Sequence, residues 1–318
     1  MPNAAAPVLA VERLTVNFGS RSVVRALSYA LVSGRTLGVV GESGCGKSMT
    51  ALALMGLVPP PGEVSGSVRL DERELIGQQA EAWQAGRGNR IAMVFQEPMT
   101  ALNPVMPVGH QIAEAIVLHE AMGWKTAEER AVALLDAVGI ASARARARAY
   151  PHQLSGGMRQ RAMIAMALAC RPAVLIADEP TTALDVTIQA QILDLMLELQ
   201  DEIGMAIQFI SHNLAVVSEI AHEIIVMYAG RIVERAPADA LFATPLHPYT
   251  QGLIATLPDP DRRVARLPVI PGGVPDFDAA GCPFADRCPR ADRGCRADEP
   301  ELRELAPGHE VACFKAAA

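Results

Sequence analysis

The chain has 318 residues, of which 50% are hydrophobic, 20% charged and 4% aromatic. This composition excludes an intrinsically disordered protein, because burial of so much apolar surface offsets the entropy lost on folding. Lys and Arg number 28 against 35 Asp and Glu, and the net charge of −7 argues against a protein that binds nucleic acid by its phosphates. At about 150 residues per domain, the length predicts two domains.

No apolar run approaches the roughly 18 residues that a membrane-spanning helix needs. The N-terminal segment MPNAAAPVLAVERL lacks the basic region and the apolar region of a secretory signal. We therefore expect a cytosolic chain whose six cysteines are not paired in disulfides.

The N-terminal third alternates predicted strands with turns. Apolar patterns typical of strands occupy residues 9–18, 23–31 and 36–40. A glycine-rich turn then leads into a predicted helix over 48–57. A buried strand followed by such a turn and a helix is typical of an α/β protein.

A helical segment and a second strand-bearing segment follow. Apolar side chains recur at helical spacing over 98–152, which predicts a helical insertion. Strands and helices alternate from 173 to 229, the pattern of a mostly parallel sheet covered by helices. Prolines recur after 230, so we expect an α/β domain over 1–235 and a small Cys- and Pro-rich extension over 236–318.

Residues 41–48 have the sequence GESGCGKS, a complete G-x-x-x-x-G-K-S phosphate-binding loop. Its backbone N–H groups and the positive end of the following helix are expected to bind phosphates. Lys47 adds a positive charge, and Ser48 a hydroxyl ligand for Mg²⁺. The residues predicted to bind ATP here are Gly41, Ser43, Gly44, Cys45, Gly46, Lys47, Ser48 and Met49.

Residues 174–178, VLIAD, form an apolar run that ends in a carboxylate. A strand of this kind brings Asp178 to the carboxyl edge of the sheet, where Mg²⁺ lies beside the phosphates. Glu179 follows directly and is placed to polarise an attacking water molecule. The pattern is weak alone but strong beside the phosphate loop.

Residues 154–160 have the sequence LSGGMRQ, and Ser155 in this segment lies 23 residues before Asp178. With the phosphate loop, this segment resembles the signature motif of the ATP-binding subunits of ABC transporters. The resemblance implies a P-loop NTPase fold, with a RecA-like core and a helical subdomain over about 98–152. It also implies that hydrolysis needs a dimer, because the signature residues contact ATP bound by a partner subunit: Ser155, Gly156, Gly157 and Gln160.

The other motifs of this family follow in order. The resemblance implies that Gln96 contacts Mg²⁺ and water, that His212 contacts the γ-phosphate and that Asp185 crosses the dimer interface. Phe18 lies 23 residues before Gly41 and is expected to stack on adenine. The implied catalytic residues are Glu179, His212 and Gln96, and the implied Mg²⁺ ligands are Ser48, Gln96 and Asp178.

Four longer segments narrow the resemblance to the dipeptide/oligopeptide (and nickel) importers: residues 95–104, 150–154, 177–185 and 247–252. The resemblance implies an ATPase that couples ATP hydrolysis to uptake of peptides or a similar small solute. The implied partners are a second ABC ATPase subunit, in a heterodimer rather than a homodimer, two transmembrane permease subunits and an extracytoplasmic solute-binding protein. The chain would then lie at the cytoplasmic face of the membrane, held by the permease subunits.

The competing interpretation is a soluble ABC ATPase that acts as a nucleotide switch in DNA repair or translation. A single cassette without a basic surface bias argues against it.

Two residues depart from the family pattern, namely Cys45 where Ser is usual and Asn213 where Asp is usual. A thiol at a helix N-terminus has a lowered pKa, so we expect Cys45 to be sensitive to thiol reagents.

Four cysteines fall within the last 37 residues: Cys282, Cys288, Cys295 and Cys313. Their spacing lacks the tight C-x₂₋₄-C pair usual for zinc, whereas a Cys₄-ligated [4Fe–4S] cluster accepts looser spacing. A segment with so little apolar surface of its own gains stability from an inorganic staple. We expect an iron–sulfur cluster here, with zinc or four metal-free cysteines as the alternatives.

Overall fold

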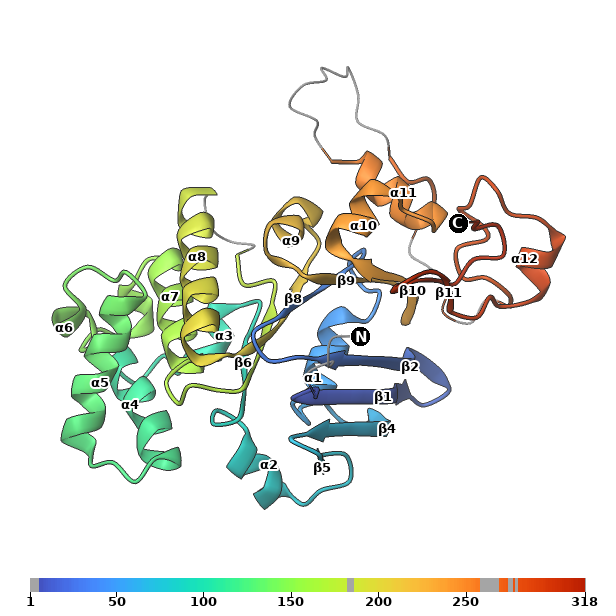
Figure 1. Cartoon of the computed structure of the whole chain (residues 1–318). Helices are drawn as coiled ribbons and strands as arrows, with labels where there is room; N and C mark the ends of the chain where they lie inside the picture. The colour runs from blue at the N-terminus through green and yellow to red at the C-terminus, as the bar shows by residue number, and fades with distance from the viewer. Residues whose placement is uncertain (1–5, 182–185, 258–268, 274–276, 278–279, 318) are drawn as a thin grey trace. The chain divides into compact units, whose positions relative to one another are not determined.

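The computed structural model describes residues 6–181, 186–257, 269–273, 277 and 280–317 (Figure 1). The chain forms two compact units, each assembled from separated stretches of sequence. The first unit draws on Met1–Leu9, Leu31–Arg35 and Asp71–Gln208, and the second on Ala10–Ala30, Thr36–Leu70 and Phe209–Ala318. The division of the sequence near residue 235 stays a prediction.

A small sheet of the second unit has the strand order β2-β1-β4. Its strands are β1 (Leu9–Phe18), β2 (Arg21–Leu31) and β4 (Glu63–Leu70). Buried and more exposed residues alternate over much of β1 and β2, which is typical of strands that turn one face to the core. The predicted strand at 9–18 is confirmed, and the one predicted at 23–31 begins two residues earlier.

The larger sheet of this unit has the order β11-β12-β10-β9-β3. The strands are β3 (Thr36–Val40), β9 (Glu223–Tyr228), β10 (Arg231–Pro237), β11 (Arg303–Ala306) and β12 (His309–Val311). β3 pairs in parallel with β9, and β10 returns antiparallel after Ala229 and Gly230, both of which have positive φ. Every residue of β3 is buried, so the phosphate loop starts at the end of a buried strand.

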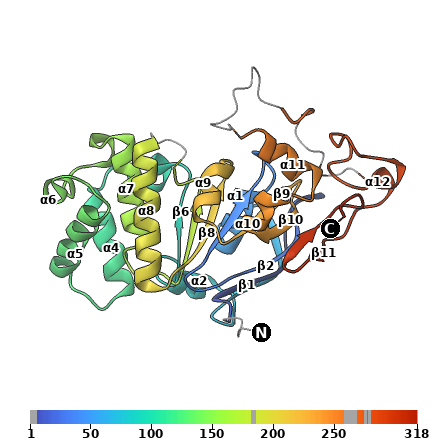
Figure 2. The same ribbon diagram turned by 45° about the horizontal axis from the view of Figure 1, so that its top comes forward.

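Short helices complete the second unit. They are α1 (Lys47–Leu54), α9 (Leu214–Ile220), α10 (Ala238–Ala243), α11 (Pro248–Ala255) and α12 (Arg293–Ala297). α10 packs against β9 and β10 (Figure 2). The helices after residue 236 stay short, as the frequent prolines predict. β8 (Ala206–Ser211) is divided between the two units.

The first unit contains two buried parallel strands, β6 (Ile91–Val94) and β7 (Val174–Asp178), paired with Val94 opposite Ala177. Its remaining peripheral elements are β5 (Arg73–Glu74), α2 (Ala80–Gly86) and α8 (Val186–Ile203). Because both strands run in the same direction, the residues that follow them, including Gln96 and Glu179, meet at one edge of the pair.

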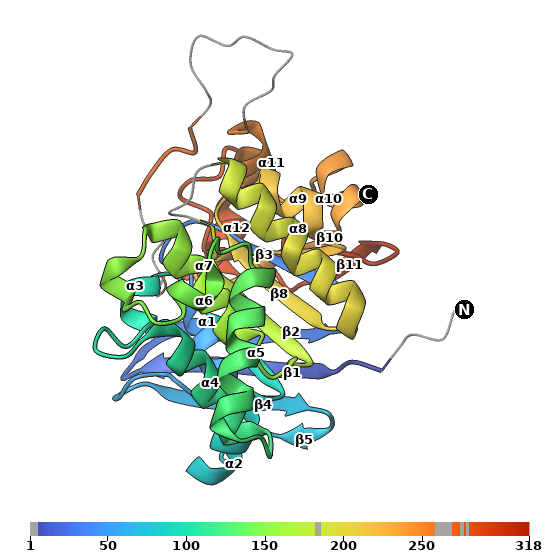
Figure 3. The ribbon, with the colours of Figure 1, turned by 90° about the vertical axis from the view of Figure 1, so that its left-hand side faces the viewer.

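Helices fill the rest of the first unit (Figure 3). They are α3 (Pro98–Ala101), α4 (Val108–His119), α5 (Trp124–Ala137), α6 (Ala143–Arg146), a 3₁₀ turn (Pro151–Gln153) and α7 (Gly156–Ala167). Contacts among α4, α5 and α7 completely bury Ile112, Ile116, Ala131 and Leu135, which confirms the helical spacing seen in the sequence. None of the helices in the described part of the chain combines the length and hydropathy of a membrane span.

Candidate functional site

The phosphate loop holds three glycines in backbone conformations that other residues rarely adopt. Gly41, Gly44 and Gly46 have φ values of 154°, 81° and 105°. A Cβ atom at Gly41 would lie 2.3 Å from the Met227 carbonyl oxygen, and one at Gly46 would lie 2.6 Å from the Val23 carbonyl oxygen. At Gly41 and Gly46 the loop therefore packs backbone against backbone on β9 and β2, which leaves no room for a side chain at these two positions.

Lys47 and Ser48 open helix α1. The Lys47 side chain is buried, and its Nζ donates to the carbonyl oxygens of Gly41 (2.7 Å) and Glu42 (3.0 Å). Ser48 is exposed in the first turn, which contains no acidic residue. A helix N-terminus beside a lysine is the arrangement that a phosphate-binding loop requires.

The Cys45 side chain within this loop is completely buried, with its Sγ 3.8 Å from Lys47 Nζ. Burial raises the pKa of the Cys45 thiol, and the nearby Lys47 charge lowers it by less. The expectation of a reactive, low-pKa thiol at this position is wrong, because desolvation of the thiolate outweighs the lysine.

Two further predicted ATP contacts belong to the second unit. Phe18 is half-buried at the end of β1, where a Cβ added to Gly62 would lie 2.8 Å from its Cζ. His212 is exposed between β8 and α9. Asn213 is the N-cap of α9, and its Oδ1 accepts from the Ala215 N–H at 3.1 Å. Asn and Asp are equally good N-caps, which explains why the departure at Asn213 is tolerated.

The first unit brings Gln96 and Glu179 together. Asp178 ends β7 and Glu179 follows it, with exposed fractions of 4% and 9%, and Gln96 Nε2 donates to Glu179 Oε2 at 3.1 Å. Glu179 has a φ of 46°, in the left-handed region that L-residues rarely adopt. Strain of this kind on a buried carboxylate is typical of functional residues.

The signature segment begins α7. Ser155 is the N-cap, with its Oγ accepting from the Met158 N–H at 3.3 Å, and Ser155 and Gly156 are exposed. Gln160 is buried and donates to the carbonyl oxygen of Pro180, the residue after Glu179. The signature helix is therefore bonded to the segment that carries the candidate catalytic carboxylate. Asp185 lies outside the described residues.

The four C-terminal cysteines line one small cavity, together with apolar residues that include Phe284 and Phe314. Backbone N–H groups two positions downstream donate to Cys282, Cys288 and Cys313. Burial raises the pKa of the Cys282 thiol to about 11, and the Phe284 N–H lowers it by less. Within the described ranges, no group of three or more His, Cys, Asp or Glu is arranged to hold a metal ion.

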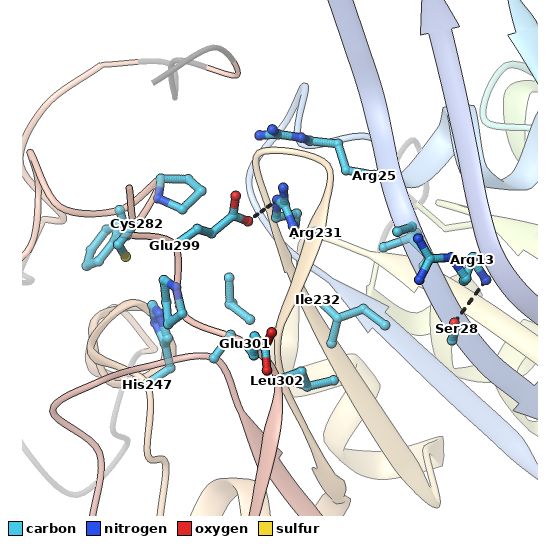
Figure 4. Close-up of a pocket in the computed structure, with 17 residues that line it drawn as sticks. Arg13, Arg25, Ser28, Arg231, Ile232, His247, Cys282, Glu299, Glu301 and Leu302 are labelled. Atoms are coloured by element: carbon cyan, nitrogen blue, oxygen red, sulfur yellow. Dashed lines mark hydrogen bonds and ion pairs between the residues drawn. The ribbon is translucent and has the colours of Figure 1, made fainter. Parts of the chain in front are cut away.

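A larger cavity of about 570 Å³ lies beside the small cavity that the four cysteines line (Figure 4). Arg13, Arg25 and Arg231 line it, and Arg231 forms an ion pair with Glu299. Cys282 borders both cavities.

Several residues that join the C-terminal extension to the rest of the second unit were not predicted. Glu234 on β10 is completely buried and accepts from the N–H groups of Leu246 (2.7 Å) and His247 (2.9 Å). His309 Nε2 lies 2.7 Å from the same carboxylate. A second link runs from Arg287 to Glu42 in the phosphate loop. These contacts join residues far apart in the chain, and no local pattern signals them.

Comparisons with known proteins agree with the motifs. Residues 24–182 match the family described as "ABC transporter", and residues 233–295 match "Oligopeptide/dipeptide transporter, C-terminal region". This chain belongs to the ATP-binding subunits of dipeptide/oligopeptide ABC transporters. A probable peptide ABC transporter ATP-binding protein of Sinorhizobium fredii is 52% identical over 97% of this chain and 95% of the relative.

Two named transport proteins are also similar along nearly their whole length. The dipeptide transport ATP-binding protein DppD of Escherichia coli is 49% identical over 96% of each chain. The oligopeptide transport ATP-binding protein OppD of Salmonella typhimurium is 47% identical over 99% of this chain and 95% of its own. These relatives support transport rather than the soluble switch considered as the alternative.

The fold agrees with solved cassettes. A dimeric ATP-binding cassette in a post-hydrolysis state, bound to ADP and Pi, superimposes with a TM-score of 0.65 at 24% identity, over 72% of this chain and 98% of its own. The cbiO1 subunit of the cbiONQ transporter from Clostridium perfringens has a TM-score of 0.63 at 25% identity, over 75% of this chain and 91% of its own. The predicted α/β ABC ATPase fold is confirmed.

Proposed function

We propose that this chain hydrolyses ATP to drive the uptake of peptides, or of a similar small solute, by an ABC importer. The observation that carries the proposal is the similarity of nearly the whole chain, C-terminal region included, to peptide-transport ATP-binding proteins. The complete phosphate loop and the strained Glu179 beside Gln96 supply the chemistry that such a subunit needs.

In this proposal the residues of the loop bind the phosphates, Phe18 stacks on adenine and His212 contacts the γ-phosphate. Ser48, Gln96 and Asp178 would hold Mg²⁺, which would supply positive charge to neutralise the phosphates. Ser48 and Asp178 are hard oxygen donors, the kind Mg²⁺ prefers, and the amide oxygen of Gln96 is another.

Glu179 is the proposed general base or water-orienting residue. Its carboxylate accepts a hydrogen bond from Gln96, which fixes the orientation in which it would meet water. Hydrolysis of ATP then depends mainly on positioning and on charge stabilisation rather than on a covalent intermediate.

The proposed active form is a dimer in which a partner subunit's signature segment closes on the nucleotide. Ser155 and Gly156 are exposed at the N-terminus of α7, where they would meet the partner's nucleotide together with Gly157 and Gln160. Asp185 is assigned to the dimer interface. We favour a heterodimer with a related ATPase, docked on two transmembrane permease subunits and fed by an extracytoplasmic solute-binding protein, at the cytoplasmic face of the membrane.

We also propose that Cys282, Cys288, Cys295 and Cys313 hold a [4Fe–4S] cluster, with zinc as the alternative. The fit rests on four sulfurs around one largely apolar cavity and on N–H···S hydrogen bonds at three of them, which stabilise thiolates. A bound cluster would stabilise a segment that has little hydrophobic core of its own. Its role would be structural, because transport requires no redox step.

Uptake of a labelled dipeptide by cells that carry the chain with its permease subunits tests the transport proposal. Glu179→Gln is expected to abolish uptake and ATP hydrolysis but to keep ATP binding. Uptake that persists at the normal rate with Glu179→Gln would contradict the proposal.

The cluster proposal is tested by measuring iron, acid-labile sulfide and zinc after anaerobic purification of the unmodified chain and of Cys288→Ser. About four irons with matching sulfide, lost in the variant, would support the cluster; zinc or no metal would refute it and leave the ATPase untouched.

A further inference from the structure

Glu42 brings a negative charge into a loop that is built to bind phosphate. In residues 41–48 the phosphate contacts come from backbone N–H groups and Lys47, so the motif does not require a carboxylate at the second position. An uncompensated carboxylate there would repel the phosphates of the nucleotide. The charge of Glu42 therefore has to be balanced from elsewhere in the fold.

Arg287 of the C-terminal extension provides that balance. Its two terminal nitrogens lie 2.6 Å and 2.9 Å from the two carboxylate oxygens of Glu42, a bidentate ion pair. The Arg287 side chain is only 8% exposed and that of Glu42 is 30% exposed. Partial burial and fork geometry distinguish this pair from an ordinary surface ion pair, because solvent screens it less.

The rest of Arg287 is held in place by its surroundings. Its Nε donates to the Pro271 carbonyl oxygen at 2.7 Å, and the guanidinium lies 5.9 Å from the centre of the Phe284 ring. A Cβ atom at Gly272 would lie 2.8 Å from Arg287 Cγ, so the backbone passes directly over the side chain. Arg287 is thus presented to the loop in one orientation.

The backbone of Glu42 is fixed on both sides as well. Its N–H donates to the hydroxyl oxygen of Tyr249 at 2.8 Å, and its carbonyl oxygen accepts from Lys47 Nζ at 3.0 Å. Tyr249 is completely buried in an aromatic group with Tyr228 and Phe284, at ring separations of 4.7 and 5.4 Å. A continuous set of contacts therefore joins the extension to the lysine of the phosphate loop.

We propose that Arg287 is a positioning residue for nucleotide binding: it orients the phosphate loop and cancels the charge of Glu42. The C-terminal extension then completes the ATP site instead of only following it in the sequence. This inference rests on the proposed function, in which residues 41–48 bind ATP. Because Arg287 acts on the loop and not on the reacting atoms, its loss raises Kd and KM for nucleotide and leaves kcat nearly unchanged.

The test is a titration of the full-length chain with MgADP and MgATP, compared with ATPase rates in the assembled transporter. Arg287→Met is expected to raise Kd about tenfold, equivalent to about 1.4 kcal/mol. Arg287→Lys, which keeps the charge but not the fork, is expected to raise it less. Glu42→Gln in the Arg287→Met background is expected to recover most of the lost affinity, because the unpaired charge is gone.

Arg290→Met is the matched control, since Arg290 is an exposed arginine of the same segment that bonds to Gln251. Electrostatic repulsion also predicts that the effect of Arg287→Met shrinks as salt rises from low concentration to about 0.5 M. A double variant that binds no better than Arg287→Met, or an Arg287→Met Kd equal to that of the control, would overturn the proposal. Failure of the unmodified chain to bind nucleotide would instead refute the proposed ATPase function.

Discussion

Glu234 offers the most direct test of how the C-terminal extension is attached. Its carboxylate is completely buried and satisfies three donors, the N–H groups of Leu246 and His247 and the Nε2 of His309. Glu234→Ala leaves the two backbone N–H groups and the imidazole without this acceptor. Each buried group left without a partner costs about 1–3 kcal/mol, and partial relaxation around the site offsets some of this cost. We therefore expect the free energy of opening the extension to fall by about 3–5 kcal/mol.

Glu234→Gln separates charge from shape. The amide keeps one acceptor oxygen but turns an NH₂ group toward a donor, so about 2 kcal/mol is expected to be lost. The assay is hydrogen exchange of the Leu246 and His247 amides, because it reports local opening of the extension rather than unfolding of the whole chain. A loss of about 3 kcal/mol lowers protection about 100-fold. Glu63→Gln, an exposed substitution on β4, serves as the control. Protection in Glu234→Ala equal to that of the control would refute the reasoning.

Three further predictions follow from the site and its surroundings. Glu179→Gln is expected to reduce ATP hydrolysis at least about 100-fold with Kd for ATP unchanged, and a rate within threefold of normal would contradict its role as base. Gly46→Ala is expected to abolish nucleotide binding, because its Cβ would lie 2.6 Å from the Val23 carbonyl oxygen at a φ of 105°; normal binding in a titration would disprove the close packing. Burial lowers the pKa of His247 from 6.5 to about 3, so below pH 6.5 the unfolded chain binds a proton that the folded chain does not. The free energy of unfolding is therefore expected to fall by up to about 1.4 kcal/mol for each unit by which the pH decreases. The variant His247→Asn keeps the N-cap and is expected to flatten this slope in urea titrations. An unchanged slope would exclude His247 as the cause.

Much of the candidate site was predictable because its signals are local. The loop at 41–48 and the strand that ends at Asp178 each combine a chemical group with the turn or strand end that presents it. Helical spacing also identified Ile112, Ile116 and Leu135 as core residues. Such patterns depend on residues that are close together in the chain, so they can be recognised before the fold is known.

The prediction for Cys45 failed for a reason that no local pattern contains. A helix N-terminus does favour a thiolate, but the sulfur is buried, out of contact with water. Desolvation raises its pKa, and desolvation depends on what the rest of the chain packs over the residue.

The phosphate loop and the succession of strands and helices could be predicted from local patterns, and the order of the motifs along the chain indicated the family. The pairing of charges and the burial of individual groups depend on residues far apart in the chain, so they followed from the fold alone. Arg287 and Glu42 are 245 residues apart, and Glu234 and His309 are 75 apart. Residues so distant in the chain are neighbours only because the fold packs the extension against the phosphate loop and β10.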